Sequence, residues 1–377
     1  MQALLVAIGF HSWVCLEYLV EMMNTENSPP LFLFGAGGAA SWVLAGFRRA
    51  KITVAGFLDE SDHRPTQVSG SPVYSPQDAP VDLDRRRDAV VVLAIMNPMA
   101  DFEAIKNRLS RDGWSHVTSL AEYSRDELSR SGRHCGMLVP GLIPAAELKS
   151  VRAILSDDHS RSLLDAFASF VESFDESALP PITSHPYFPP GLPRWSTPMR
   201  IIDCGAFDGD SLRAADAAGY TVVASASFEP DPGNYSRLAA AVKDRIGAAA
   251  WPCGVSDRTG LQRFSAQGDT GSSLQETGDA SIQCVSLDDS LPGFIPTLIK
   301  MDIEGAEEDA LKGAEGLIRR HSPGLAISVY HHSSDIWRIP LWLRDRYPPD
   351  TRYFLRRHSR TIADTVFYVL PSNQPAE

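Results

Sequence analysis

The chain has 377 residues, of which 44% are hydrophobic and 22% charged, a globular composition with enough length for two domains. Its formal net charge of -12 argues against a nucleic acid as the main partner, because such partners are usually bound by a basic face. The five cysteines are scattered and form no C-x-x-C pair, which argues against a disulfide framework or a zinc cluster. We therefore expect a reducing compartment, the cytoplasm.

Polar residues interrupt the apolar stretch of residues 4–20, and no basic segment precedes it. A signal peptide or a membrane-spanning helix is therefore disfavoured. We predict an N-terminal helix over residues 1–26 and no membrane span.

A strand and a glycine turn open the next part of the chain. Residues 31–34 are apolar and lead into Gly35 and Gly37, and a helix is predicted over residues 39–49. A second strand, over residues 52–58, ends in Asp59. This spacing is typical of a Rossmann βαβ unit, in which glycines let a phosphate approach and the acid binds a ribose. A purely structural turn explains the same residues equally well, so a nucleotide site at Gly35, Gly37 and Asp59 stays one of two alternatives.

The first domain is assigned to residues 27–136. Strands over residues 89–95 and 114–119 and a helix over residues 102–111 complete it. Apolar residues at helical spacing follow up to residue 173, and a run of prolines comes next. Prolines prevent regular helix, so we predict a helical and proline-rich linker over residues 137–196, its extended part laid as a strap on the second domain.

Strands and helices alternate in the second domain, residues 197–377. Strands are predicted over residues 200–204, 222–228, 248–255, 261–265, 281–285, 297–301, 325–330, 352–357 and 365–370, and helices over 211–218, 234–243, 304–320 and 336–346. Alternation that ends in a hairpin predicts a mostly parallel sheet with an antiparallel edge. The fold class is therefore α/β, with two separate sheets.

The first strand of this domain ends in Asp203, and Gly205 and Gly209 follow it. Glycine is needed where the backbone approaches a ligand closely, and Asp203 holds the turn or meets an amino group of the ligand. Glu229 closes the second strand, where a carboxylate is placed to bind two ribose hydroxyls. The pattern predicts a site for S-adenosylmethionine (SAM) and hence a methyltransferase, the alternative being a structural turn.

Two acids follow the apolar strand over residues 297–301. Asp302 and Glu304 reach its C-terminal end, which borders the crevice where open α/β sheets bind ligands. Carboxylates there are suited to orient or deprotonate a hydroxyl. Glu304 and Glu307 also lie in the first turn of the predicted helix, where the helix dipole alone favours acids, and for Glu307 we prefer this structural explanation. Paired acids near a helix start often bind no ion, so no metal site is predicted.

The strand over residues 325–330 is followed by His331 and His332. Histidine accepts protons near neutral pH, which suits it to act as a general base. Successive strand residues face opposite sides, so only one of the two is expected to enter the crevice. His331 is the preferred candidate.

Taken in order, these motifs resemble the FkbM family of SAM-dependent methyltransferases. The resemblance rests on residues 203–212, 228–231, 286–289, 300–312 and 330–331 together with Asn234 and Leu238, and it extends over residues 197–370. It implies a class I methyltransferase sheet, Rossmann-like and preceded by a smaller Rossmann-like α/β domain. Such leading domains, in longer members, resemble the nucleotide-binding part of sugar acyltransferases.

The resemblance also implies roles for individual residues. Asp203, Gly205 and Gly209 hold the methionine part of SAM, and Glu229 binds its ribose. Asp302, Glu304 and His331 lie on the acceptor side, and His332, which stands where many relatives have Lys, is kept as a further catalytic candidate. The other cofactor-binding candidates are Ala206, Asp210, Ser211, Pro230 and Asn234.

We therefore expect O-methylation of a hydroxyl on a sugar, a glycan or a related metabolite, with SAM as the cofactor. Two alternatives remain. The first glycine turn could serve an NAD-dependent oxidoreductase, or it could hold a nucleotide-sugar in a protein without catalysis. The sequence leaves the oligomeric state open, a homo-oligomer included.

Overall fold

The computed structural model describes residues 29–97, 99–136, 143–265, 273–274 and 280–372, so the helix predicted over residues 1–26 lies outside its description. The chain forms two compact units. The first contains residues 1–36, 53–93 and 101–118, and the second contains the rest. Among the helices described, none is long and apolar enough to cross a membrane.

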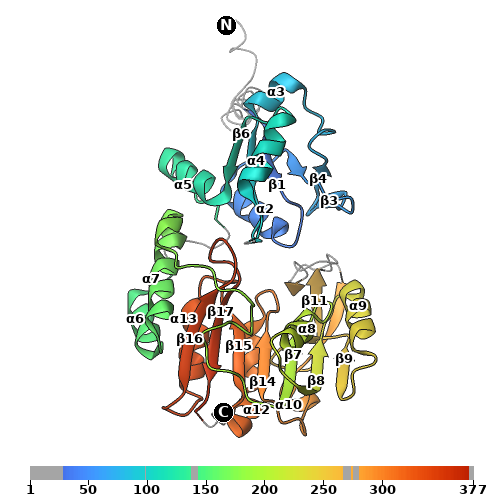
Figure 1. Ribbon diagram of the computed structural model, residues 1–377, viewed down its shortest axis with the longest axis vertical. Helices are drawn as coiled ribbons and strands as arrows, with labels where there is room; N and C mark the ends of the chain where they lie inside the picture. Colours follow the sequence, from blue (N-terminus) through green and yellow to red (C-terminus); the bar gives the residue numbers. More distant parts are fainter. Residues whose placement is uncertain (1–28, 98, 137–142, 266–272, 275–279, 373–377) are drawn as a thin grey trace, which may run out of the picture. The chain divides into compact units, whose positions relative to one another are not determined.

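A sheet with the strand order β3-β4-β2-β1-β5-β6 organises the first part of the chain (Figure 1). Its strands are β1 (Leu31–Phe34), β2 (Gly56–Leu58), β3 (Gln67–Val68), β4 (Ser71–Tyr74), β5 (Val90–Leu93) and β6 (His116–Ser119). β1 runs parallel to β2 and β5, as expected for a Rossmann unit. Phe32 contacts Trp114 edge to face, with 5.3 Å between ring centres, and both side chains are buried.

The helices of this part are α2 (Ala40–Arg49), α3 (Leu83–Asp88) and α4 (Phe102–Arg111). α2 and α4 occur where the sequence predicts them. β3, β4 and α3 were not predicted, because a two-residue strand and a helix without a buried residue carry no apolar period. α3 is capped at its N-terminus by Asp82, whose side chain accepts the Arg85 backbone N–H at 2.8 Å.

Three helices lead into the second sheet: α5 (Leu120–Ser131), α6 (Ala145–Ile154) and α7 (Asp158–Ser173). α5 was not predicted; Ser119 and Glu122 form a capping box at its start. α7 buries a row of apolar side chains and lies against β16. Beyond a short 3₁₀ turn at η1 (Glu176–Ala178), the proline-rich segment has no regular structure before residue 199, as predicted.

The second sheet has the order β16-β17-β15-β14-β7-β8-β9. Its strands are β7 (Met199–Cys204), β8 (Val222–Phe228), β9 (Ala248–Trp251), β14 (Leu298–Met301), β15 (Gly324–Ser328), β16 (Arg352–Arg357) and β17 (Thr365–Leu370). β17 pairs antiparallel with β15 and β16, and the other pairs are parallel. The predicted parallel sheet with an antiparallel edge hairpin is confirmed. The helices α8 (Asp210–Ala217), α9 (Pro232–Val242), α10 (Leu287–Ser290) and α13 (Asp335–Arg344) connect these strands.

The single strand predicted over residues 248–255 is wrong. β9 belongs to the seven-stranded sheet, whereas β10 (Gly254–Val255) pairs with β13 in a separate sheet of order β10-β13-β11-β12. Pro252 lies between them and has no N–H to continue a ladder, so the chain leaves one sheet and enters the other. The remaining strands of the small sheet are β11 (Gly260–Ser265), β12 (Ser273–Leu274) and β13 (Ala280–Val285).

The single helix predicted over residues 304–320 is also wrong. It consists of α11 (Glu307–Lys312) and α12 (Glu315–His321). Glu304 and Gly305 have φ values of 57° and 100°, which are incompatible with a right-handed helix. Gly313 interrupts the helix where a Cβ would lie 2.0 Å from the carbonyl oxygen of Ser256. Glu304 therefore belongs to a loop that precedes α11, and its backbone is not part of a first helical turn.

Candidate active site

The glycine turn after β7 is shaped by close contact between two strand ends. Gly205 has φ 76°, and a Cβ there would lie 1.9 Å from the carbonyl oxygen of Asp302. The backbone N–H groups of Gly205 and Ala206 both donate to Phe228 at 3.0 Å. Gly209, with φ 86°, precedes α8 as its N-cap. Only glycine fits at residue 205, because the end of β14 occupies the space of a side chain.

Glu229 closes β8 and its carboxylate turns back to this glycine turn. Oε2 accepts the backbone N–H of Phe207 at 2.9 Å, and Oε1 accepts that of Asp231, also at 2.9 Å. The residue is only 5% exposed, and this burial raises the pKa of its carboxyl group. The structure thus places Glu229 where the sequence predicts a ribose-binding acid.

The other predicted cofactor residues surround the same two strand ends. Asp210 and Ser211 are the first two residues of α8, and the buried Ser211 hydroxyl has no hydrogen-bond partner within the described part of the chain. Pro230 follows Glu229, and Asn234 is buried in the first turn of α9. These residues thus come from the start of α8, the end of β8 and the start of α9.

Asp203 is fully buried and contacts Lys300. The Lys300 Nζ atom lies 3.2 Å from Asp203 Oδ1 and donates to the carbonyl oxygen of Gly205 at 2.6 Å. Burial opposes the charge on Lys300, but the nearby carboxylates, Asp203 foremost, outweigh it and raise the lysine pKa. Asp203 therefore orients a cation that binds the turn, which supports the turn-holding role among the two predicted for it. The sequence indicated Lys300 only through its place near a strand end.

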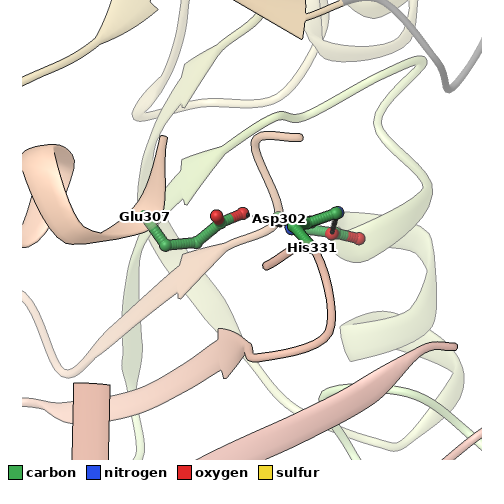
Figure 2. Close-up of side chains that lie close together, drawn as sticks. All are labelled: Asp302, Glu307 and His331. Carbon is green, nitrogen blue, oxygen red and sulfur yellow. Dashed lines mark ion pairs between the residues drawn. The ribbon is translucent and has the colours of Figure 1, made fainter. Parts of the chain in front are cut away.

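Three carboxylates face one imidazole at the ends of β14 and β15, and Figure 2 shows two of them, Asp302 and Glu307, with His331. His331 Nδ1 lies 2.8 Å from Glu307 Oε1, while Nε2 lies 3.4 Å from Asp302 Oδ1 and 3.8 Å from Glu304 Oε2. The side chains of His331 and Glu307 are each 1% exposed, compared with 24% for Asp302 and 17% for Glu304. Asp302 and Glu304 are thus the members that solvent reaches.

Glu307 needs more than the helix-dipole explanation that we preferred from the sequence. Besides facing His331, its Oε1 accepts the backbone N–H of Ile303 at 2.8 Å. A carboxylate this deeply buried requires such partners, since an isolated buried charge is costly. The spacing of four residues between Ile303 and Glu307 was the available signal, but it does not identify the histidine.

The structure distinguishes the two histidines. His331 points to the carboxylates, whereas His332 is exposed and its Nε2 lies 3.2 Å from the carbonyl oxygen of Gly305. The backbone N–H of His332 donates to Asp335 at 2.9 Å. The two histidines thus point to different surroundings, and His331 is the one that faces the carboxylates.

The charges of this cluster follow from its contacts. Burial opposes protonation of His331, but Glu307 first, then Glu304 and Asp302, outweigh it and raise the histidine pKa to about 10. Burial would raise the pKa of Asp302, yet Lys300 and His331 lower it. At neutral pH the cluster therefore contains an imidazolium and an ionised Asp302.

Tyr187, in the proline-rich strap, completes this site and was not predicted. Its hydroxyl donates to Asp302 Oδ2 at 2.7 Å, and the Tyr330 hydroxyl lies 3.5 Å from Oδ1. The Tyr187 ring also lies over Lys300, with Nζ 5.1 Å from its centre. An aromatic residue within the run of prolines was the only signal available for it.

The first glycine turn has its own acid. Asp59 Oδ2 accepts the backbone N–H of Ala36 at 2.7 Å, and Oδ1 accepts that of Ser61 at 2.8 Å. Gly35 has φ 104°, and the space around a Cβ at Gly37 is open to at least 4 Å. These contacts explain Asp59 as a residue that closes the turn, and a nucleotide there stays a prediction.

Comparison with known proteins identifies the second site. Residues 203–360 match the family model of the methyltransferase FkbM domain. This segment is therefore similar to the FkbM methyltransferase domain. It begins at Asp203 and includes the glycine turn, Glu229 and the carboxylates around His331. The match falls on the part of the chain from which the sequence resemblance was drawn.

One solved structure supports the same architecture outside the FkbM segment as well. The crystal structure of methyltransferase FkbM from Methylobacillus flagellatus KT aligns with 98% of this chain and 96% of its own, at a TM-score of 0.62 and 23% identity. At this identity the likeness establishes the fold, including the Rossmann-like part before the FkbM domain. Among curated proteins, none matches the chain at a significant level.

Proposed function

We propose that this protein is a SAM-dependent O-methyltransferase that acts on a hydroxyl of a sugar, a glycan or a related metabolite. The observation that carries the proposal is the Glu229 carboxylate, buried at the end of β8 and hydrogen-bonded to the turn that follows β7. In Rossmann-type sheets an acid at this place binds the ribose of an adenine cofactor. When bound, SAM supplies a methyl group that its sulfonium has already activated for transfer.

The residues around the turn fit such a cofactor. Each oxygen of Glu229 accepts one N–H, and a carboxylate oxygen can accept a second donor, so both can still bind ribose hydroxyls. The Ser211 hydroxyl is buried without a partner in the described structure, and it lies in the first turn of α8. We assign the cofactor to Glu229, Ser211 and the predicted residues beside them: Asp203, Gly205, Ala206, Gly209, Asp210, Pro230 and Asn234.

On the acceptor side, Asp302 rather than His331 is assigned to the hydroxyl. Asp302 is ionised at neutral pH and partly exposed, whereas His331 is 1% exposed and already protonated. An imidazolium cannot accept a proton, so the role of general base that the sequence favoured for His331 passes to Asp302. A positioned base of this kind contributes about 10²–10⁴-fold to a rate.

The other members of the site hold Asp302 in place. The imidazolium of His331 and the Tyr187 hydroxyl contact different oxygens of its carboxylate. Both contacts fix the orientation of the oxygen that faces an acceptor. Glu304, also partly exposed, offers a second carboxylate to a neighbouring hydroxyl. Two carboxylates and two tyrosine hydroxyls suit a ligand with several hydroxyls, which supports a sugar-like acceptor.

Calorimetry and a product assay test this function. SAM should bind the full chain, and Glu229→Ala should weaken its binding while circular dichroism shows the fold retained. Glu229→Gln keeps the shape and one acceptor oxygen, so its loss of affinity should be smaller. Methyl label from SAM should then enter a sugar or glycan in a form stable to alkali, as expected for an ether.

Three outcomes would contradict the proposal. Absence of SAM binding to the folded full chain would remove the enzyme assignment. Unchanged affinity in Glu229→Ala would remove the cofactor site. Label released by mild alkali, or found on an amine, would show that the acceptor is an ester-forming carboxylate or a nitrogen.

A further inference from the structure

Three side chains from separate segments converge near the end of β14. Asp302 follows β14, Glu307 begins α11, and His331 lies beyond β15. Each offers one ligand atom, and these atoms all lie within 4.8 Å of one another. Figure 2 shows the Glu307 carboxylate directed toward the other two side chains. Asp302 and His331 come just after the paired strands β14 and β15, and Glu307 begins the helix after β14, so regular elements support all three.

The buried atoms of this group are not explained by hydrogen bonds. Neither ring nitrogen of His331 has a hydrogen-bond partner of acceptable geometry within the described structure, and neither does Glu307 Oε2. Both side chains are 1% exposed. A buried polar atom without a partner is costly, so such an atom in a native protein usually contacts a further group, such as a water molecule or an ion. The His331 imidazole and the Glu307 carboxylate therefore face one another without forming a hydrogen bond of acceptable geometry.

The charges of the group also favour a cation. Asp302, Glu304 and Glu307 all lie within 3.8 Å of the His331 ring nitrogens. Three carboxylates exceed the single charge that an imidazole can carry. Lys300, a cation next to this group along the chain, contacts Asp203 and the carbonyl oxygen of Gly205. A buried excess of negative charge is costly unless a further cation balances it.

We propose that Asp302, Glu307 and His331 bind one divalent metal ion, of the Mn²⁺ or Mg²⁺ class. Two carboxylate oxygens and one imidazole nitrogen form a mixed set suited to Mn²⁺, and the carboxylates also suit Mg²⁺. Only a neutral imidazole binds a metal, so the ion displaces one proton of the His331 imidazolium, which is released to solvent. The sequence showed acids near a helix start, which often bind no ion, and it did not reveal the contact between Glu307 and His331.

A metal at this place would bear on the acceptor. Asp302 and Glu304 are the partly exposed members of the group, so the open coordination positions lie on the side that solvent reaches. Water or two hydroxyls of an acceptor fill such positions. This consequence, unlike the metal site itself, rests on the proposed function.

Mn²⁺ binding to the full chain tests the proposal directly. Protein treated with a chelator and then freed of it is titrated with Mn²⁺ alone, and the free ion is followed by electron paramagnetic resonance. One Mn²⁺ should bind per chain, Mg²⁺ should compete with it, and the thermal unfolding midpoint should rise. Glu307→Gln should weaken Mn²⁺ binding at least about tenfold. His331→Gln should weaken it as well.

The neighbouring residues provide matched controls. Glu308 follows Glu307 directly but pairs with Arg338 at 2.8 Å, and His332 follows His331 but is exposed. Glu308→Gln and His332→Gln should bind Mn²⁺ as the wild type does. If Glu308→Gln weakens Mn²⁺ binding as much as Glu307→Gln does, and His332→Gln as much as His331→Gln, the proposed site is wrong. It is also wrong if the wild type shows no saturable binding of Mn²⁺ or Mg²⁺. If Glu307→Gln fails to fold, the test rests on the number of Mn²⁺ ions bound by the wild type and on the Mn²⁺ affinities of His331→Gln and His332→Gln.

The two proposals fail in different ways. SAM affinity is measured on the metal-free chain, so it does not depend on Mn²⁺. SAM binding without Mn²⁺ binding would overturn the metal site alone. Mn²⁺ binding that requires Glu307, without SAM binding, would overturn the proposed function alone.

Discussion

The two glycine turns of this chain have the same backbone plan. Gly35 donates its N–H to the end of β2 at 2.9 Å, and Gly205 donates to the end of β8 at 3.0 Å. In both turns an acid, Asp59 or Glu229, closes the second strand. This acid accepts one backbone N–H from the glycine turn and a second one from the residue two positions after the acid itself. A glycine turn closed by an acid is thus a property of the Rossmann architecture.

The turns differ in what the neighbouring strand brings to them. β5 lies beside β1, and β14 lies in the corresponding place beside β7. β5 is followed by the uncharged residues 94–97, whereas β14 is followed by Asp302 and Glu304. Asp59 is half-buried and Glu229 almost fully buried. The comparison teaches that glycines and an acid indicate a fold, while charged residues at a third strand end indicate chemistry.

The largest effect is expected at that third strand end. Asp302→Asn should reduce kcat about 10²–10⁴-fold, because the amide cannot accept the acceptor's proton. SAM affinity should stay near that of the wild type. Asp309→Asn, which changes an exposed acid of α11 paired with Lys312, serves as the control in steady-state kinetics. Activity retained in Asp302→Asn would contradict the difference drawn between the two turns.

Replacing one glycine of each turn with alanine should show how tightly the backbone is packed at that position. Gly205→Ala should destabilise the fold by about 2–4 kcal/mol, since it combines a strained φ with a backbone clash. Gly37→Ala meets open space and should change stability by less than about 1 kcal/mol. Denaturant unfolding measures both, and a similar cost in the two variants would mean that the turns are packed alike.

The acids should differ in their effect on SAM. Glu229→Ala removes a charged hydrogen-bond acceptor, which is expected to cost about 1.5–3 kcal/mol, or roughly 10–100-fold in SAM affinity. Asp59→Ala should leave that affinity unchanged and affect only stability, by about 1 kcal/mol. Isothermal titration of both variants checks this. A loss of SAM affinity in Asp59→Ala would place cofactor contacts at the wrong turn.

The pH dependence should reveal His331. Its pKa, about 10 in the folded chain against 6.5 for the free side chain, is raised, so its stabilisation is complete below pH 6.5 and is lost as the pH rises toward 10. The free energy of unfolding should fall in this window by up to about 1.4 kcal/mol per pH unit. His331→Gln should remove this slope. Burial raises the pKa of Cys253 and Cys284 to about 11, so these thiols ionise more readily in the unfolded chain and add a slope of their own. The difference between wild type and variant is therefore measured.

Local pattern predicted much of this fold. The helix over residues 102–111 and the strands over 222–228, 352–357 and 365–370 occur with the predicted bounds. Their apolar period and their flanking residues lie within one segment, so a single sequence contains the information. The glycine turn and Glu229 could also be predicted from the sequence, because a strand, a glycine turn and an acid follow one another at a typical spacing in Rossmann units.

Contacts between distant segments decided the rest. The sequence could not separate His331 from His332 or find Glu307, because both answers depend on how the segment after β15 meets the start of α11. Tyr187 and Asp302 are 115 residues apart, so no local pattern relates them. Residues 248–255 divide between two sheets for the same reason. Helices, strands and turns depend on residues that are close in the sequence, so a local pattern predicts them. The partner of a buried charge depends on which distant segments pack together, and no local pattern contains that information.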